Sequence, residues 1–350
     1  MRVRVGALEG RHLLTASILI AFILAVIAGL IYSRIATYSL TSTITVEELQ
    51  GLPIWYIPIT YLIDYLSHGW ICLLFAFVAA GLIYELVPKS VITNYMRRGR
   101  VTGYILALVA APLLTACSCT MVPLFAGMLY SGAGIGPAIT FLLTAPSANI
   151  LAILLTGDML YWELAWVRVA VSVAVALLAG IIVSITPWGR RVEEEVHRSG
   201  WSCDVAVSEV SPPLDEKLLS ALKFGGYLAK QILPYFIIGL IAVSYVEAFL
   251  PSDIVGSYLT GFSGVLMASV IGGPLYTPTL VEVVVGKGLW SLGMSKGALL
   301  AWLMDQPYEV ANALAVSRIT RWNVVATYMV IAWAGSVAFG TLYGILSGSL

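Results

Sequence analysis

Long runs of apolar residues constrain this chain more than any other feature of its sequence. Most are about 20 residues long, and a helix of that length crosses the roughly 30 Å of hydrocarbon in a bilayer. Charged residues make up 11% of the 350 residues and apolar residues 59%, whereas a soluble domain carries about 25% charged residues. We therefore expect an all-α, polytopic membrane protein. No alternating strand pattern of the kind found in membrane barrels occurs.

Polar stretches between the apolar runs divide the chain into four regions. We expect an N-terminal span with an extracytoplasmic segment (1–67), a first membrane repeat (68–186), a cytoplasmic linker (187–223) and a second membrane repeat (224–350). The first apolar run is longer than the core of a signal peptide, so we expect it to remain as a span. The apolar segments are Leu13–Tyr32, Gly69–Val87, Gly103–Ser131, Pro137–Thr156, Leu164–Thr186, Phe224–Leu250, Gly261–Val285, Gly297–Val316 and Val324–Leu346.

The two membrane regions resemble each other. The sequence L-V-P-K-S-V-I-T-N-Y from Leu86 matches F-L-P-S-D-I-V-G-S-Y from Phe249, and A-P-L-L-T from Ala111 matches G-P-L-Y-T from Gly273. The offset between matching residues stays between 161 and 163. A constant offset over such distances predicts two homologous halves.

The distribution of Lys and Arg indicates how the halves are oriented. If every apolar segment spans, 9 basic residues lie inside and 8 outside, which contradicts the usual inside excess. If Gly103–Ser131 and Gly261–Val285 each enter and leave on one side, the count becomes 14 inside and 3 outside. Each half then has three spans plus one broken or re-entrant hairpin. Because three is an odd number of crossings, the second half has the opposite orientation in the membrane to the first half. Inverted repeats of this kind are typical of secondary transporters.

A broken segment, Ala111–Gly127, contains the most unusual side chains. Cys117 and Cys119 lie between Pro112 and Pro123, and proline interrupts helical hydrogen bonding. Freed backbone groups at membrane depth are tolerated where protein or a water-filled cavity covers them. Thiolates bind soft metals and metalloids, so this segment is a candidate binding site. The alternative is a proline-kinked helix in which the cysteines pack as small apolar residues.

The predicted substrate site combines this segment with its partner in the second half. Asn149 and Asn312 follow Pro146 and Pro307, where we expect them to cap broken helices or face a cavity. The partner segment has glycine, proline and hydroxyl residues where the first has cysteines. The candidate substrate-binding residues are Cys117, Ser118, Cys119, Thr120, Pro123, Asn149, Gly273, Pro274, Tyr276 and Thr277.

Acidic residues within apolar segments are candidates for ion or proton coupling. Ionisable groups at membrane depth are costly and usually functional, and here they are Glu282, Asp305 and Glu309. The alternative for Asp305 is a solvated position near the hydrocarbon edge. Arg168 lies five residues after Glu163, a poor spacing for a helical ion pair, and we assign neither residue a role.

Several classes of protein are disfavoured by the sequence. The four cysteines and three histidines are scattered, so neither a zinc site nor a disulfide scaffold is expected. The net charge is zero, and no basic patch predicts a nucleic-acid partner. No Walker motif occurs, which excludes an ATP-driven pump within this chain. We expect no cofactor, no resident metal and no enzymatic activity, with the lipid bilayer and a small solute or ion as partners.

The motifs A-C-S-C-T-M-V-P-L-F-A-G-M and G-P-A-I-T-F-L-L-T-A-P-S-A-N resemble a known family. It is the predicted permease family that includes the organoarsenical efflux permease ArsP and the YraQ-type proteins. The resemblance implies a multi-pass permease of the inner membrane with two related halves, and organoarsenicals are the substrates of the ArsP branch. Two positions depart from the expected pattern, namely Thr120 after C-S-C and the sequence D-Q-P at Asp305–Pro307.

The leading functional hypothesis is secondary transport of a small solute across the cytoplasmic membrane. The solute is a thiophilic metalloid or organoarsenical species, or alternatively a small inorganic or sulfur-containing anion. A second hypothesis is a membrane thiol-redox protein that uses Cys117 and Cys119. A third is a membrane scaffold without transport, for which broken internal repeats would be an unusual requirement.

Overall fold

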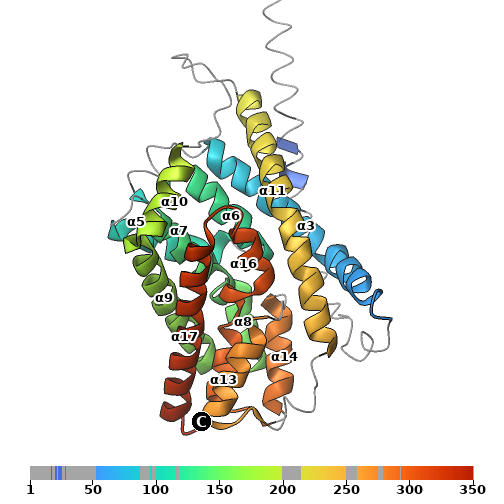
Figure 1. Cartoon of the computed structure of the whole chain (residues 1–350), viewed down its shortest axis with the longest axis vertical. Coiled ribbons are helices and arrows are strands. Elements are labelled where there is room, and N and C mark those ends of the chain that lie inside the picture. The colour runs from blue at the N-terminus through green and yellow to red at the C-terminus, as the bar shows by residue number, and fades with distance from the viewer. Residues whose placement is uncertain are drawn as a thin grey trace, which may run out of the picture.

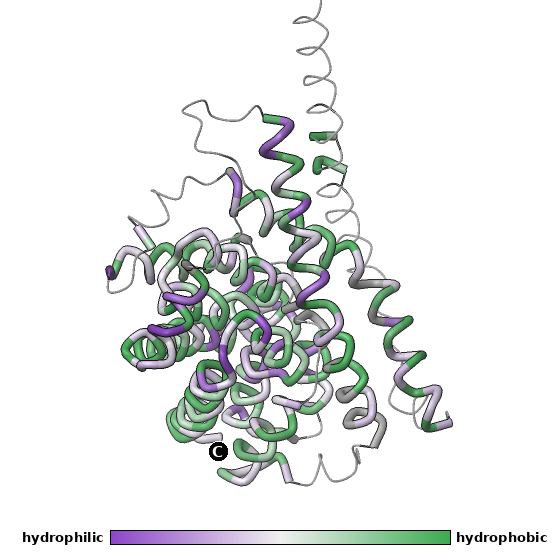
Figure 2. The backbone as a smooth tube through the Cα atoms, turned by 45° about the horizontal axis from the view of Figure 1, so that its top comes forward, coloured by the Kyte–Doolittle hydropathy of each residue, from purple (hydrophilic) through white to green (hydrophobic). Residues whose placement is uncertain are grey.

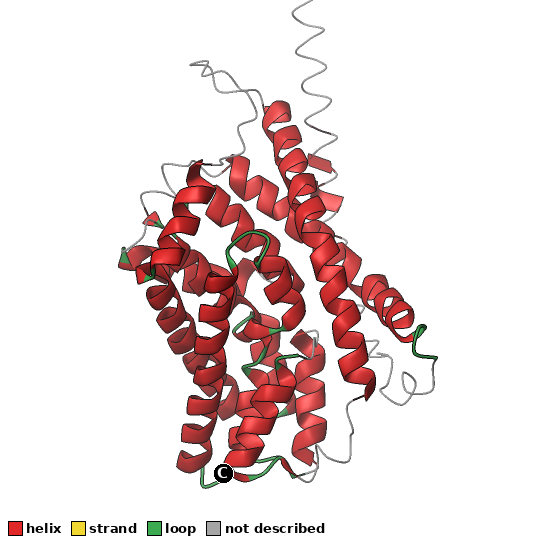
Figure 3. Cartoon of the chain, viewed as in Figure 1, coloured by secondary structure: helices red, strands yellow, loops and turns green. Residues whose placement is uncertain are grey.

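A computed structural model describes most of the chain after residue 52 and a few positions before it. The described residues are 17, 20, 21, 23–25, 28, 53–86, 95, 96, 100–114, 118–198, 214–249, 258–274, 279–291 and 293–349. Every regular element in them is helical (Figure 3). The expected first span lies largely outside the described residues.

Each half contributes a matching series of helices. In the first half these are α3 (Ile57–Leu86), α5 (Val101–Leu114), α6 (Ser118–Tyr130), α7 (Ile135–Ser147), α8 (Ile150–Met159) and α9 (Trp162–Ile185). In the second half they are α11 (Leu214–Phe249), α13 (Gly261–Gly272), α14 (Thr279–Ser291), α15 (Lys296–Leu303), the short 3-10 helix η1 (Gln306–Tyr308), α16 (Val310–Val316) and α17 (Trp322–Leu346). The helix α10 (Pro187–Arg198) follows the first series.

Within the part of the chain that the structure describes, three stretches are long and apolar enough to cross a membrane. They are Ile135–Met159, Trp162–Ile185 and Trp322–Leu346, with 24 or 25 residues each. Large apolar side chains on the outside of α9 and α17 are exposed, for example Trp166 at 64% and Val330 at 62%. Polar groups, in contrast, are buried inside. This distribution suits a hydrocarbon solvent, and the chain is an all-α, multi-pass membrane protein.

Some helices extend beyond the apolar runs from which spans were predicted. Helix α3 begins at Ile57, twelve residues before the expected span at Gly69, and α11 begins at Leu214 rather than Phe224. The start of α11 is strongly hydrophilic (Figure 2). The linker was expected to be polar and extramembrane, and its first part forms α10, whose Val192 and Val196 are buried.

Close contacts between helices recur in both halves at the offset found in the sequence. Gly180 of α9 lies so near α7 that a Cβ atom there would be 2.7 Å from the carbonyl oxygen of Gly136. In the second half, a Cβ at Gly340 of α17 would be 2.9 Å from the carbonyl oxygen of Gly297 in α15. Glycine permits this approach because it has no Cβ. The pairs α7–α9 and α15–α17 therefore pack alike.

A hydrogen bond at the same helix contact also occurs in both halves. The donor lies on α7, the first helix of its pair, in the first half and on α17, the second helix of its pair, in the second half. Thr140 Oγ1 of α7 donates to the carbonyl of Ala176 in α9 at 3.2 Å. Ser336 Oγ of α17 donates to the carbonyl of Ala301 in α15 at 2.9 Å. The two positions correspond at offsets of 160 and 161.

Helices α5 and α6 form a first hairpin whose two ends meet, and α13 and α14 form a second. Gly134, after α6, donates its N–H to the carbonyl of Met96, before α5, at 2.8 Å. Ser295, after α14, donates to the carbonyl of Leu259, before α13, at 3.0 Å. In each hairpin the chain thus leaves and returns at one end of the molecule.

The two hairpins open toward opposite ends of α9. Near the end of α9, Ser184 accepts a hydrogen bond from Tyr104 in α5 at 3.3 Å, and Glu193 of α10 accepts one from the N–H of Ile135 at 3.1 Å. Near the start of α9, the ring of Tyr161 lies 5.5 Å from that of Trp290 at the end of α14. Helix α9 is about 36 Å long at 1.5 Å per residue.

Helices α9 and α17 lie side by side and run in opposite directions (Figure 1). Tyr343, near the end of α17, donates its hydroxyl to Glu163, near the start of α9, at 3.0 Å. At the other end, Trp188 just after α9 donates to Thr327 near the start of α17 at 3.2 Å. These contacts hold both ends of the pair.

Candidate functional site

The candidate site lies where two helices are interrupted. The first break is residues 147–149, between α7 and α8, and the second break is residues 304–309, between α15 and α16. Each contains or directly follows a proline, Pro146 or Pro307, which cannot donate the hydrogen bond that would continue the helix. Helix α7 packs against η1 of the second break.

The first break is built around Asn149. Its backbone is extended, and its Oδ1 accepts a hydrogen bond from the N–H of Ala152 at 2.8 Å. This is the geometry of a helix N-cap, so the expectation that Asn149 caps a broken helix is confirmed. Asn149 and Ser147 are both buried.

The breaks and the inner ends of the hairpins lie at similar depth. Helices α6 and α7 each have 13 residues, and they run toward and away from the same end of the molecule. At 1.5 Å per residue, each extends about 20 Å. The start of α6 and the end of α7 are therefore about equally far from that end.

Part of the predicted substrate site cannot be placed. Cys117, Tyr276 and Thr277 lie outside the described residues, as do the side chains of Ser118 and Cys119. Thr120 and Pro123 are buried in the first two turns of α6. Gly273 and Pro274 follow directly after α13, with Gly273 buried and Pro274 half-buried.

An ion pair joins the two halves in the interior. Arg168 Nη2 of α9 lies 2.9 Å from Glu282 Oε2 of α14, and both side chains are 0% exposed. Arg168 Nη1 also donates to Thr156 Oγ1 of α8 at 3.1 Å. Trp302 of α15 donates its indole N–H to the carbonyl of Glu282 at 3.2 Å. Four helices from both halves are thereby tied to one pair of charges.

This pair corrects the sequence-based assignment of Arg168. We expected no role for Arg168 or for Glu163, because their spacing along α9 is poor for pairing. The structure instead pairs Arg168 with an acid 114 residues away. Glu163 accepts from Tyr343 at the helix start. The sequence did contain a signal, since only two basic residues, Arg168 and Lys230, and few acids lie within the apolar segments, and buried charges in membranes are usually paired.

Asp305 is the third buried charge. It is 0% exposed, so the alternative of a solvated position is wrong. Neither carboxylate oxygen has a hydrogen-bond partner among the described residues, and the carboxylate interacts electrostatically with Glu282 and Arg168. It packs against the end of α13, where a Cβ at Gly272 would be 1.6 Å from Asp305 Oδ2.

Other residues of the second break are also held by specific contacts. Tyr308 donates its hydroxyl to the carbonyl of Ser269 in α13 at 3.0 Å, and its ring lies against Gly273. Glu309 is buried and accepts a hydrogen bond from Asn312 Nδ2 at 2.7 Å. The predicted coupling residues Glu282, Asp305 and Glu309 are thus all in the interior, although their role in coupling stays a prediction.

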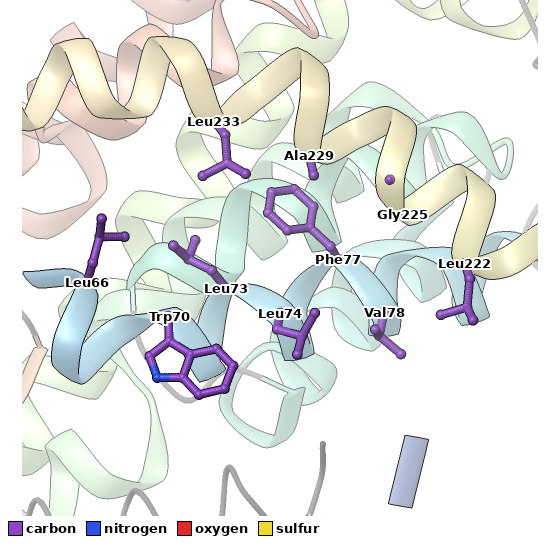
Figure 4. Close-up of a pocket in the computed structure, with 11 residues that line it drawn as sticks. Leu66, Trp70, Leu73, Leu74, Phe77, Val78, Leu222, Gly225, Ala229 and Leu233 are labelled. Atoms are coloured by element: carbon purple, nitrogen blue, oxygen red, sulfur yellow. The ribbon is translucent and has the colours of Figure 1, made fainter. Parts of the chain in front are cut away.

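A separate groove lies between α3 and α11 (Figure 4). It has a volume of about 550 Å³, and its lining is apolar apart from the indole nitrogen of Trp70. Phe77 from α3 and Leu233 from α11 are among its walls. This groove contains none of the predicted site residues and offers no charged group to a polar solute.

Comparisons with known proteins agree with the resemblance seen in the sequence. UPF0718 protein MJ0584 of Methanocaldococcus jannaschii is 28% identical over 351 residues, which cover 83% of this chain and 95% of that protein. UPF0718 protein YraQ of Escherichia coli is 22% identical over 308 residues, covering 85% of this chain and 86% of YraQ. No solved structure matches the chain. The sequence profile of a family described as a predicted permease matches residues 59–345. The chain therefore belongs to this predicted permease family.

Proposed function

We propose that the protein is a secondary transporter that moves a small solute across the cytoplasmic membrane. Its binding site is formed where the two breaks and the inner ends of the two hairpins come together. The observation that carries the proposal is the buried group of Arg168, Glu282 and Asp305. These charges link the two halves at membrane depth, where ionisable groups are costly unless function requires them.

The arrangement of the halves supports an inverted repeat of the regions 68–186 and 224–350. Matching hairpins open toward opposite ends of α9, and the matching helices α9 and α17 are antiparallel. Inverted repeats whose broken helices meet near the midplane are the usual basis of alternating access. Met96, before the first hairpin, and α10 of the linker lie at one end, which supports the predicted cytoplasmic location of both segments.

Asp305 is the proposed coupling residue, with Glu282 and Glu309 as its partners. Among the described residues, the interior contains the basic side chain of Arg168 and the acidic side chains of Glu282, Asp305 and Glu309. A buried net charge is unfavourable, so the group is stabilised by a proton or another cation at Asp305. Loading and release of that cation on opposite sides would couple a gradient to solute movement.

The cysteine pair supplies the proposed selectivity for thiophilic species. Two thiols separated by one residue can reach a single metalloid where the chain is not helical, and Cys117 lies between α5 and α6. The family resemblance to organoarsenical permeases agrees with such a substrate.

Transport by purified protein in proteoliposomes tests this proposal. We would assay a trivalent methylarsenical, arsenite and thiosulfate with and without a proton gradient, and compare wild type with Asp305→Asn. This substitution keeps the shape that fits against Gly272. Gradient-driven transport should fall by about tenfold or more, equivalent to ~1.4 kcal/mol or above.

The exposed residue Glu195 provides a matched control, because Glu195→Gln removes a carboxylate outside the interior. It should transport at the wild-type rate. If Asp305→Asn keeps the wild-type rate and gradient dependence, Asp305 is structural. If wild type moves none of the three solutes in either direction, the proposed substrate range is wrong.

A further inference from the structure

The two breaks present opposite hydrogen-bonding groups. Within the described residues, the buried polar atoms without a partner at the first break are Ser147 Oγ and Asn149 Nδ2. At the second break they include both carboxylate oxygens of Asp305 and Oδ1 of Asn312. The first break thus offers an amide donor and a hydroxyl that can donate or accept, and the second break offers acceptors.

The amide of Asn149 has a defined orientation. Its Oδ1 must face the N–H of Ala152, from which it accepts at 2.8 Å, and a backbone N–H bonds only to the oxygen of the amide. The Nδ2 group is therefore fixed as a donor beside the first turn of α8. Asn149 is 1% exposed, and a buried donor without an acceptor costs about 1–3 kcal/mol. Such a site favours a ligand that supplies an acceptor.

The start of α8 reinforces this preference. Helix α8 has 10 residues, and the N-terminus of a helix carries free N–H groups and a partial positive charge. Anions bind at such ends for both reasons. Ser147 lies two residues before the cap and adds a buried hydroxyl that has no partner among the described residues.

The second break is unsuited to an anion. Asp305 would repel it, and Asn312 Nδ2 is already used by Glu309 at 2.7 Å, which leaves Asn312 Oδ1 as an acceptor. Carboxylate and amide oxygens bind protons or small cations. The two breaks are thus adapted to ligands of opposite charge.

We propose that the first break, Ser147 and Asn149 with the start of α8, binds the oxygen atoms of a small oxyanion substrate. The substrate class is the anion of a sulfur or arsenic oxyacid, and its co-transported or exchanged cation occupies the second break. This assignment rests on the proposed transport function and names its substrate class.

Asn149→Asp is the most discriminating variant. Aspartate caps a helix as well as asparagine does, so the hydrogen bond from Ala152 is kept while the donor is replaced by a negative oxygen. Asn149→Ser also keeps a cap and removes the donor without adding charge. The matched control is Ser295→Asp, because Ser295 caps α15 by accepting from Ala298 at 3.3 Å and lies away from both breaks.

Binding is measured as thermal stabilisation of the purified full chain by sulfate, thiosulfate and methylarsonate, with chloride at equal ionic strength as the reference. A ligand that binds the folded state raises its stability with concentration. At least one oxyanion should stabilise wild type and Ser295→Asp. Asn149→Asp and Asn149→Ser should need about tenfold or more of the same anion to reach the same thermal stabilisation. A loss of this size is expected when a hydrogen bond to a charged group is removed.

Two results would overturn the assignment. One is that none of the three oxyanions stabilises wild type, and the other is that both Asn149 variants bind as wild type does. If Asn149→Asp does not fold, the anion affinity of Asn149→Ser alone tests whether Asn149 binds the oxyanion. Transport of a neutral solute without any oxyanion binding would refute the anion site and leave the transporter proposal standing. If oxyanion binding depends on Asn149 but no solute is transported, the anion site is supported and the transporter proposal is refuted.

Discussion

The first break and the second break occupy equivalent places in the two halves, yet they differ in chemistry. At an offset of 161, Thr144 corresponds to Asp305 and Ala148 to Glu309. The first half has no acid at these positions, and the second half has two. Glu282 corresponds to Thr120 at the offset of 162 that applies around Ala111, so the first half has no acid there either. The acids of the interior therefore come from the second half, and their cation, Arg168, comes from the first.

The helix contacts, in contrast, are shared. The glycine approaches of α7 to α9 and of α15 to α17 are nearly the same, and so is the hydrogen bond beside them. Packing is repeated because each half must bury the same helix faces, whereas the ligand groups are under no such constraint. The two halves thus share the same helix contacts, whereas the buried acids lie in the second half and their buried cation, Arg168, lies in the first.

The largest expected effect comes from breaking this charge complementarity. Arg168→Met leaves Glu282 buried without its cation, and removing one partner of a buried pair costs about 3–5 kcal/mol. We expect a strongly lowered melting temperature of the purified protein in detergent. Tyr328 is the matched control, since it stands in α17 where Arg168 stands in α9 and is also buried; Tyr328→Phe should change the melting temperature little.

The double variant Arg168→Met with Glu282→Leu separates pairing from packing. Replacing both charges of a buried pair by apolar residues is often neutral or stabilising, so this variant should recover most of the lost stability. If it is as unstable as the sum of the single variants, the two residues do not act as a pair.

The shared glycine contacts should give intermediate and similar effects in both halves. In Gly180→Ala the new Cβ would be 2.1 Å from Thr140 Oγ1, and in Gly340→Ala it would be 2.9 Å from the carbonyl oxygen of Gly297. Overpacking of this kind costs about 1–3 kcal/mol. Both variants should lower the melting temperature, with Gly180→Ala the more severe. A clear effect in one half only would contradict the repeated scaffold.

Much of this arrangement was accessible from the sequence, because it depends on local patterns. Apolar runs, prolines and the constant offset predicted the spans, the breaks and the paired halves. Asn149 as a cap followed from its place after Pro146. Asp305 and Glu282 stood out because acids are rare in apolar segments.

The partner of Arg168 was not accessible in this way. An ion pair across 114 residues depends on how two halves dock, and no local spacing encodes that. The helical linker segment α10 and the early start of α3 were missed because their exposed faces are polar or aromatic. Both are held by packing against neighbouring helices, which hydropathy along one segment does not register.

The cysteines offer a smaller and more selective test of the difference between halves. The first hairpin contains Cys117 and Cys119, and the second has no cysteine at G-G-P-L-Y-T-P. Exchanging both for serine replaces soft ligands by hard hydroxyls of similar size. Transport of a trivalent arsenical should fall about tenfold or more, equivalent to ~1.4 kcal/mol or above, while a non-thiophilic solute is unaffected. Undiminished transport of both solutes would make the cysteines packing residues.

The pH dependence of arsenical binding sharpens the same point. The thiolate binds the metalloid, whereas the thiol does not. Affinity in the wild type should therefore rise with pH below the range in which thiols ionise, and the serine variant should lack this rise. Titration of the purified protein with a trivalent methylarsenical at several pH values measures it.

The smallest expected effect is at the surface, where the two ends of the α9–α17 pair differ. One end is held by Tyr343 and Glu163, and the other by an ion pair of Arg321 with Glu195. The hydrogen bond from Arg321 holds the pKa of Glu195 below its usual value. A depressed pKa in the folded state means that the pair stabilises the protein above the pKa of the unfolded chain, about 4.3. This contribution is lost as the pH falls through the folded-state value.

Both side chains of this pair are about half exposed, so water and salt weaken their attraction. Glu195→Gln should therefore lower the melting temperature slightly at pH 7 in low salt. The difference from wild type should vanish at about 1 M salt, where the screening length is only ~3 Å, and again as the pH falls through the lowered folded-state pKa of Glu195. Arg321→Gln should behave alike, and the double variant should be no less stable than either single one. A large, salt-independent loss of stability would instead mean that Glu195 and Arg321 hold α10 against α17 through packing of their side chains and not through their charges.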